Sequence, residues 1–300
     1  MINFECLNKT LSNKNWDKIA NKRYKNPLSL KQMFSLDQKY QKIIKNNISL
    51  VDHPIYEDAI VKYLPLNNSG LKEKEYYNIF SGTIGPEIYK ETILHKDLGI
   101  ELVMESAGSL NNVIMDIDCR EQRIEVAYQT ANLLLCLEEA EIIHGDVKPG
   151  NILIKRQTND LILTDFEYSS NYKEFKRTAS KENAIKKFHG TPGYIAPELF
   201  EENFDFDDYD PISLDMFSYG NLIYNLIHKR RPNYPGIDQL NNESFEKYKQ
   251  SMINERYLEF NRDLVVGNTD KKLLQIVYAC TEPSPKMRPS SFNEITSLLR

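Results

Sequence analysis

The spacing of hydrophobic and polar residues divides the chain into a strand-like part and a helix-like part. Up to Met104, short segments with alternating or briefly continuous apolar residues predict strands, and apolar side chains at helical spacing predict one helix at 71–81. Beyond that point, apolar residues recur with the period of amphipathic helices. The predicted strands are 40–45, 58–65, 87–94 and 100–105, and the predicted long helices are 120–140, 213–229 and 270–282.

This change of period predicts an α+β fold with two lobes joined by a short segment. The smaller N-lobe, residues 38–104, would be an antiparallel β-sheet with one helix. Residues 105–109 would form the hinge, and the mostly α-helical C-lobe would comprise residues 110–300. Residues 1–37 are polar and rich in lysine and asparagine, and we assign them to an N-terminal extension.

Composition narrows the classes of function. The chain has 300 residues, of which 41% are hydrophobic and 27% charged. A chain of this length can form two lobes, each with a buried core. A net charge of −5 gives no basic field that would attract nucleic acid. The four cysteines have no paired spacing, and the chain has neither an apolar signal segment nor a run long enough to span a membrane. We therefore expect a cytoplasmic protein with free thiols.

The stretch IIHGDVKPGNILI, from Ile142 to Ile154, places polar groups between two apolar runs. Asp146 could accept a proton from a hydroxyl, and Lys148 could neutralise a developing negative charge. Asn151 and, at the end of a predicted hairpin, Asp165 carry the oxygen ligands that Mg²⁺ prefers. These groups would serve phosphoryl transfer. A polar turn with local side-chain hydrogen bonds explains the same residues, so this stretch alone leaves the choice open.

Three further stretches follow in order: GTPGYIAPEL from Gly190, SLDMFSYG from Ser213 and KMRPS from Lys286. With the first stretch they make the chain resemble the eukaryotic protein kinase family from Tyr40 to Arg300. HGDVKPGN is similar to its catalytic loop, DFE to its metal-binding DFG and APE to the end of its activation segment. The resemblance implies a bilobal protein kinase-like fold, ATP and Mg²⁺ as cofactors, and a protein substrate.

The resemblance also implies residue roles in the C-lobe. Asp146 would orient the substrate hydroxyl, Lys148 would contact the transferring phosphate, and Thr191 would bond both. Asn151 and Asp165 would hold Mg²⁺. The scaffold around them would include a buried Glu198–Arg288 ion pair and Asp215, which would brace the catalytic loop.

For the nucleotide, the resemblance implies a lysine on a strand and a glutamate on the predicted helix. Lys62 would contact the α- and β-phosphates. Glu73 is its expected partner because Tyr76, Tyr77 and Phe80 follow it at core-facing spacing, although Glu75 stays an alternative. The further residues assigned to cofactor binding are Met104, Glu105, Ala107 and Leu153.

The chain departs from the family at four points. No glycine lies between Tyr40 and Lys62, so the loop that covers the phosphates is weakened or absent, although Asn46 and Asn47 could make its turn. Ile60 replaces a small residue beside the adenine, and Glu167 replaces the glycine of DFG. Gly145 replaces the arginine before Asp146, so we expect no switching by phosphorylation of Thr178 or Ser180.

Three functions remain open from the sequence. The first is a Ser/Thr protein kinase of low activity, because the groups that touch the reacting phosphate and metal are present. The second is a pseudokinase that acts as a scaffold or binding module, which the first two departures favour. The third is a small-molecule kinase similar to choline and aminoglycoside kinases, but those lack a segment such as GTPGYIAPE and the Asp215 and Arg288 scaffold. Neither the substrate nor the oligomeric state follows from the sequence.

Overall fold

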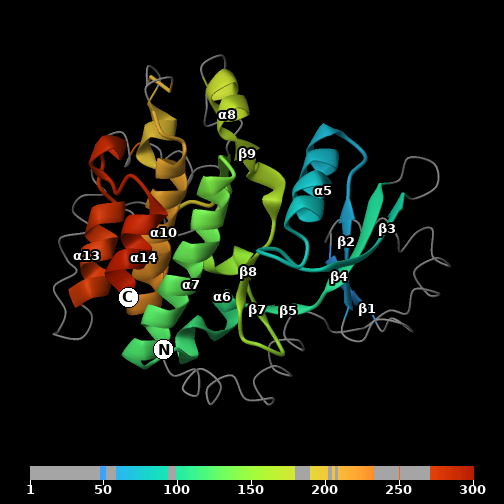
Figure 1. Cartoon of the computed structure of the whole chain (residues 1–300), viewed down its shortest axis with the longest axis horizontal. Coiled ribbons are helices and arrows are strands. Elements are labelled where there is room, and N and C mark those ends of the chain that lie inside the picture. Colours follow the sequence, from blue (N-terminus) through green and yellow to red (C-terminus); the bar gives the residue numbers. More distant parts are fainter. Residues whose placement is uncertain are drawn as a thin grey trace. The chain divides into compact units, whose positions relative to one another are not determined.

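The computed structural model in Figure 1 describes residues 48–51, 59–93, 99–179, 190–201, 205–206, 209–232, 250 and 271–300. The predicted extension at 1–37, the predicted strand at 40–45, Asn46, Asn47 and Ser180 lie outside these residues. The described residues form two compact units. The sheet unit comprises the described residues up to Val113 together with Ile152–Glu167, and the helical unit comprises Ile114–Asn151 and the described residues from Tyr168 to Arg300.

The sheet unit is built on four antiparallel strands in the order β1-β2-β4-β3. The two central strands, β2 and β4, are buried along almost their whole length because their sequences, AIVKYL and IELVME, are largely apolar. Three of the strands match predicted segments, whereas β1 was not predicted. The bounds are β1 Ile48–Val51, β2 Ala59–Leu64, β3 Ile88–Ile93 and β4 Ile100–Glu105.

Helix α5, Asn68–Phe80, packs on β2 and confirms the predicted helix (Figure 1). It begins where the Asn67 side chain accepts a hydrogen bond of 3.0 Å from the Gly70 N–H, which caps the first turn. Its buried face carries Glu73, Tyr76, Tyr77 and Phe80, which recur at the spacing of one helical face. This face therefore presents one carboxylate and three aromatic rings to the sheet unit.

A second, three-stranded sheet completes this unit, with the antiparallel order β5-β7-β8. Strands β7, Ile152–Lys155, and β8, Leu161–Leu163, form the predicted hairpin. Strand β5, Ala107–Ser109, pairs with β7 and leads into the short helix α6, Leu110–Val113. The described contacts thus group 107–113 and the hairpin with the sheet unit, and the predicted lobe and hinge boundaries stay a prediction.

Four helices form the core of the helical unit, and two of them, α7 and α10, pack against one another (Figure 1). Residues 212–226 of α10 are buried, including its polar Asp215, Ser218, Asn221 and Asn225. Buried polar groups need partners, and the Ser218 hydroxyl donates to the Tyr194 carbonyl oxygen at 2.7 Å. The four helices are α7 Arg120–Glu139, α10 Ile212–His228, α13 Lys271–Cys280 and α14 Phe292–Leu299.

Shorter elements connect these helices. Strands β6, Ile142–Ile143, and β9, Ser170–Asn171, pair with one another, and β6 leads into the HGDVKPGN stretch. Helix α8, Tyr172–Ala179, follows directly, in a segment for which the sequence predicted no helix. The 3-10 turns are η2 Ile114–Asp116, η3 Pro149–Asn151, η4 Phe166–Tyr168, η5 Pro197–Phe200 and η6 Pro285–Met287.

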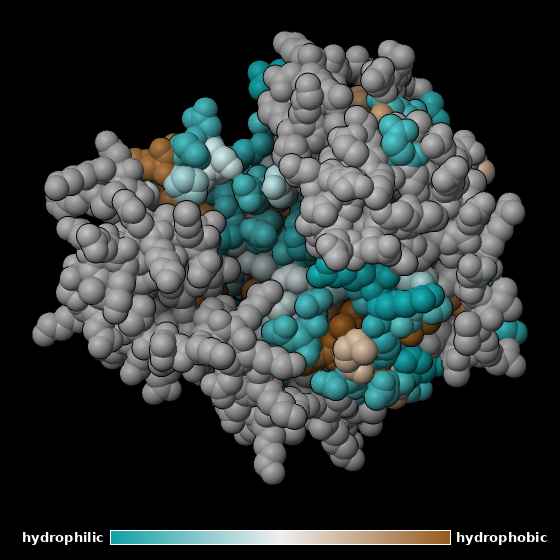
Figure 2. Space-filling model, turned by 180° about the vertical axis from the view of Figure 1, so that it is seen from behind, coloured by the Kyte–Doolittle hydropathy of each residue, from teal (hydrophilic) through white to brown (hydrophobic). Residues whose placement is uncertain are grey.

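The described surface is largely hydrophilic on the face shown in Figure 2, with smaller hydrophobic areas between polar residues. Exposed apolar side chains such as Ile79, Met115 and Met287 come from different elements. Apolar residues spread singly over a surface are usual. Within the described part of the chain, no helix is long and apolar enough to cross a bilayer.

Candidate active site

A buried lysine–glutamate pair lies inside the sheet unit. The Lys62 Nζ donates a 2.5 Å hydrogen bond to Glu73 Oε1, and both side chains are only 6% exposed. Lys62 comes from β2 and Glu73 from α5, so the contact ties the helix to the sheet. The structure thus brings Lys62 to Glu73, whereas the alternative, Glu75, is exposed on the other face of the helix.

Burial and the neighbouring charges shift the pKa of each member of this pair in opposite directions. Burial disfavours the charged form of Lys62, but Tyr77, Asp165 and Glu73 outweigh it and raise the pKa of the ammonium well above its usual value. Burial raises the pKa of the Glu73 carboxyl, and the nearby Lys62 only partly reverses this. Lys62 therefore stays positively charged at neutral pH and can attract an anionic group.

Asp165 is the second carboxylate beside Lys62, with its Oδ1 at 3.0 Å from the Nζ. Its side chain is 39% exposed, so it can reach a ligand in solvent. Its backbone has φ +68°, a left-handed conformation that is uncommon for residues other than glycine. The next residue, Phe166, is fully buried against Tyr76, Tyr77 and Phe80, with ring centroids 5.2–6.5 Å apart. This aromatic packing anchors the segment that presents Asp165.

The residues expected around an adenine lie on β4, β5 and β7. Met104 is buried on β4, directly across from Ile60 on β2, and Ile60 is also buried. The Glu105 N–H donates to the Glu87 carbonyl oxygen at 2.8 Å. Ala107 is partly exposed at the start of β5, and Leu153 on β7 is 7% exposed.

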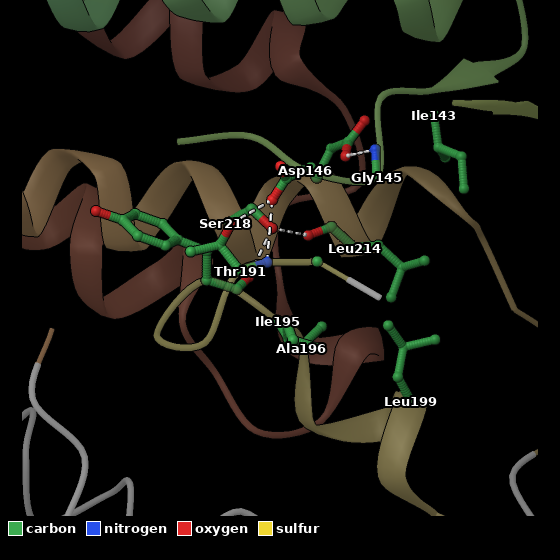
Figure 3. Close-up of a pocket in the computed structure, with 12 residues that line it drawn as sticks. Ile143, Gly145, Asp146, Thr191, Ile195, Ala196, Leu199, Leu214 and Ser218 are labelled. Atoms are coloured by element: carbon green, nitrogen blue, oxygen red, sulfur yellow. Dashed lines mark hydrogen bonds between the residues drawn. The ribbon is translucent and has the colours of Figure 1, made fainter. Parts of the chain in front are cut away.

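The helical unit holds the other cluster, centred on the buried carboxylate of Asp146 (Figure 3). The Thr191 N–H and hydroxyl donate to its Oδ1 at 3.0 and 2.8 Å. The Asn151 side-chain amide donates to Oδ2 at 2.9 Å, and the Lys148 ammonium donates to the same oxygen. Lys148 also donates to the Thr191 hydroxyl at 2.7 Å. The four residues thus form one closed network, which fixes the orientation of the Asp146 carboxylate.

Asp215 braces the backbone just before Asp146, as the resemblance implied. Its two carboxylate oxygens accept hydrogen bonds from the His144 N–H at 2.6 Å and the Gly145 N–H at 2.9 Å. Complete burial raises the pKa of Asp215, while His144 and these N–H donors act against that rise. Since Asp215 lies in the first turn of α10, the core helix directly positions the backbone at His144 and Gly145.

Gly145 occupies a position that suits only glycine. Its φ is +80°, and a β-carbon placed there would lie 2.7 Å from the Tyr168 carbonyl oxygen. Any larger residue, arginine included, would be strained at this backbone conformation and would clash with Tyr168. The missing arginine therefore coincides with a backbone conformation that excludes one.

A buried ion pair anchors the end of the segment that carries Thr191. The Arg288 guanidinium donates to both oxygens of Glu198, at 2.7 and 2.8 Å, and both side chains are almost inaccessible to solvent. The predicted pairing is therefore confirmed. Tyr209 adds a third donor, with its hydroxyl at 2.6 Å from Glu198 Oε1. Such two-point contacts fix orientation as well as charge.

The cavity beside Asp146 and Thr191 in Figure 3 has a volume of only about 10 Å³, close to the space that one water needs. Its walls include Asp146, Thr191, Asp215 and Ser218. A volume of this size has room for a water but not for a substrate.

The donor chemistry of Asn151 and Asp165 fits Mg²⁺. Asn151 uses its side-chain amide nitrogen for its two bonds to Asp146, and its amide oxygen is a hard ligand of the kind Mg²⁺ prefers. Among the residues that the structure describes, no three His, Cys, Asp or Glu side chains are gathered closely enough to hold a metal ion.

The antiparallel sheet with its lysine–glutamate pair and the helical unit with its Asp146 network define a protein kinase domain. The family model of the protein kinase domain matches residues 86–299, and the chain belongs to this family. The predicted α+β kinase-like fold is thereby confirmed. Members of the family in general use ATP and Mg²⁺.

Curated relatives share this domain at modest identity. The chain is 30% identical over 204 residues to the probable serine/threonine-protein kinase fhkE of Dictyostelium discoideum, covering 60% of this chain and 26% of that protein. It is 25% identical over 197 residues to the rust resistance kinase Lr10 of Triticum aestivum, covering 63% and 29%. It is 29% identical over 196 residues to the serine/threonine-protein kinase nekl-2 of Caenorhabditis elegans, covering 59% of this chain and 51% of that protein. The matched part spans about a quarter to a half of these relatives.

The hydroxyl of Tyr77 is a polar group of the sheet unit that the sequence did not predict. It lies 3.2 Å from Lys62 Nζ, 3.0 Å from the Asp165 backbone nitrogen and 2.9 Å from Thr164 Oγ1. The helical spacing identified Tyr77 only as a core residue. A tyrosine on the same helical face as Glu73 was the available signal, since a buried phenol usually needs a polar partner.

Proposed function

We propose that this chain is an ATP- and Mg²⁺-dependent protein kinase that transfers the γ-phosphate to a Ser or Thr hydroxyl of a protein substrate. The observation that carries the proposal is the network around Asp146. A polar turn would need only local backbone partners, whereas this carboxylate is fixed by an ammonium group and by Thr191, forty-five residues away. A fixed carboxylate beside a lysine suits proton acceptance next to a phosphate.

The chain's own groups would divide the work as follows. Asp146 would orient the substrate hydroxyl and accept its proton, and Lys148 would balance the charge that develops on the transferring group. Lys62, held by Glu73, would bind the nucleotide phosphates, and Asn151 with Asp165 would hold the metal. Bound ATP and Mg²⁺ would supply the phosphoryl group and the neutralising charge.

Two features support Ser/Thr rather than Tyr as the acceptor. Lys148 and Pro149 follow the catalytic aspartate closely, and several relatives carry serine/threonine-protein kinase in their names. A cytoplasmic location stays a prediction from the sequence.

A pseudokinase that binds partners without efficient phosphate transfer is the second candidate. The observation that favours it is the buried Ile60 opposite Met104, which takes up room in the expected adenine pocket. The absence of glycine between Tyr40 and Lys62 also hinders the close approach of backbone N–H groups to the phosphates.

The two aspartates separate these candidates because they act at different steps. Asp146→Asn should leave Mg-ATP affinity unchanged and lower turnover on a basic protein such as histone by ~10²–10⁴-fold. Asp165→Asn should weaken Mg²⁺-dependent nucleotide binding as well as turnover. Asp118→Asn is a suitable control, since this side chain is 85% exposed.

Nucleotide titration with and without Mg²⁺, followed by phosphate-transfer assays at high ATP, provides the measurement. Slow transfer that depends on both aspartates would support the kinase. If millimolar Mg-ATP causes neither a thermal shift nor phosphate transfer, including transfer to the protein itself, the pseudokinase is the better description.

A further inference from the structure

Tyr77 places a phenol at the centre of the nucleotide half of the proposed site. It lies four residues after Glu73 on α5, so both side chains project from the same face of the helix. Tyr77 is fully buried. Its hydroxyl is within 3.2 Å of three polar atoms: Lys62 Nζ, the Asp165 backbone nitrogen and Thr164 Oγ1.

The hydrogen-bonding capacity of this hydroxyl is fully used. A phenol offers one donor and two acceptor positions. The Lys62 ammonium and the Asp165 N–H can only donate, so they occupy both acceptor positions. The hydroxyl hydrogen is then left for Thr164 Oγ1 at 2.9 Å. One side chain thus binds the phosphate lysine and the backbone of the metal aspartate at the same time.

The ring of Tyr77 holds the same segment from a second side. It meets Phe166 edge to face, with centroids 5.2 Å apart at 85°, and the Lys62 Nζ lies 5.2 Å from its centroid. Asp165 has the uncommon φ of +68°, and such a conformation persists only when its surroundings hold it. Tyr77 contacts the backbone of Asp165 and the side chain of Phe166, so it is placed to do this.

We propose that Tyr77 is a positioning residue that keeps Lys62 and Asp165 in the arrangement required for Mg-nucleotide binding. The proposal rests on the proposed kinase function and deepens it. Glu167 replaces the glycine that lets this segment move in the family, and the Tyr77 hydroxyl adds a hydrogen bond that fixes the segment further. Tyr77 touches neither substrate nor metal in this role, and it acts through the two residues that do.

Tyr77→Phe tests the role because it removes the hydroxyl and keeps the ring against Phe166. The gain in nucleotide affinity on adding Mg²⁺ should fall by about 5–10-fold, which is the loss expected for one hydrogen bond. The hydrogen-exchange rate of the Asp165 amide, measured without nucleotide, should rise by about the same factor. KM for ATP should rise more than kcat falls, because the groups around Asp146 are untouched.

Tyr219→Phe is the matched control. Tyr219 is equally buried, and its hydroxyl donates to the Ala127 carbonyl oxygen at 2.9 Å in the helical unit. This variant should lose thermal stability without changing the Mg²⁺ dependence or the exchange of the Asp165 amide. If Tyr77→Phe behaves in the same way as Tyr219→Phe in both measurements, Tyr77 is only a core residue and the proposal is wrong.

The exchange measurement also separates this proposal from the proposed function. If the unaltered chain binds no nucleotide, the kinase proposal fails, while faster exchange at Asp165 in Tyr77→Phe would still show that the hydroxyl positions this backbone. An unchanged exchange rate would overturn the positioning role whether or not nucleotide binds.

Discussion

Replacing Arg288 by alanine should destabilise the helical unit strongly, because the change leaves a buried carboxylate without its cation. Arg288 donates to both Glu198 oxygens, to the Ser213 carbonyl at 2.9 Å and to the Glu282 and Pro283 carbonyls at 2.8 and 3.0 Å. Its guanidinium also lies 4.9 Å from the centre of the Phe217 ring. The alanine variant loses all of these contacts together.

The magnitude follows from the burial of the partner that remains. Glu198 is almost inaccessible to solvent, and removing one member of a buried pair typically costs ~3–5 kcal/mol. For a protein of this size, each kcal/mol lowers the melting temperature by roughly 2–4 °C. We therefore expect Arg288→Ala to melt about 6–20 °C lower in differential scanning calorimetry.

Lys74→Ala provides the comparison. Lys74 and Glu91 also form a short ion pair, at 2.6 Å, but their side chains are 23% and 30% exposed. A pair near the surface typically contributes ~0–1 kcal/mol, so this variant should melt within a few degrees of the unaltered protein. Similar melting temperatures for Arg288→Ala and Lys74→Ala would refute the reasoning from burial.

Two further predictions concern the backbone before Asp146 and the pH. Gly145→Ala should destabilise the protein by ~1–3 kcal/mol in chemical denaturation, because residue 145 has a positive φ and lies close to the Tyr168 carbonyl. Gly150→Ala should leave the free energy of unfolding almost unchanged, since its β-carbon would meet only ordinary contacts. Burial raises the pKa of Glu73, so the folded protein takes up this proton before the unfolded chain does. As the pH falls through that raised pKa, Lys62 loses its ionised partner and nucleotide affinity should fall. Over the same pH range the contribution of Glu73 to the free energy of unfolding should rise. Glu73→Gln should abolish the pH step in nucleotide titrations.

Residues whose position depends on local spacing could be predicted from the sequence. Glu73 lies on the same helical face as Tyr76, Tyr77 and Phe80, and that spacing selected it over Glu75 as the partner of Lys62. The Asp146 stretch was equally visible, because its polar groups interrupt apolar runs over a few residues. In both cases neighbours in the chain carry the information.

Features that depend on distant parts of the chain could not be predicted in this way. Strand β5 reads AGS, which has no strand pattern, and it is a strand only because β7 pairs with it. Strand β1 is four residues long and follows two asparagines, so its pattern is too short to stand out. The hydrophobic pattern also treats a tyrosine as an apolar position, so it does not predict which polar atoms the Tyr77 hydroxyl contacts.

Two of the departures from the family, at Gly145 and at Glu167, concern the ways in which a kinase is switched. Gly145 excludes an arginine through its backbone, so a phosphate on the segment after Glu167 would lack the usual cation, and Thr178 in that segment is itself 8% exposed. The segment from Asp165 to Glu167 has lost its glycine and is held by aromatic packing and by the Tyr77 hydroxyl. Both changes remove ways of switching while the groups expected to act on the phosphate stay in place. If the proposed kinase activity holds, we therefore expect nucleotide affinity and substrate supply, and not phosphorylation of the chain's own activation segment, to set it.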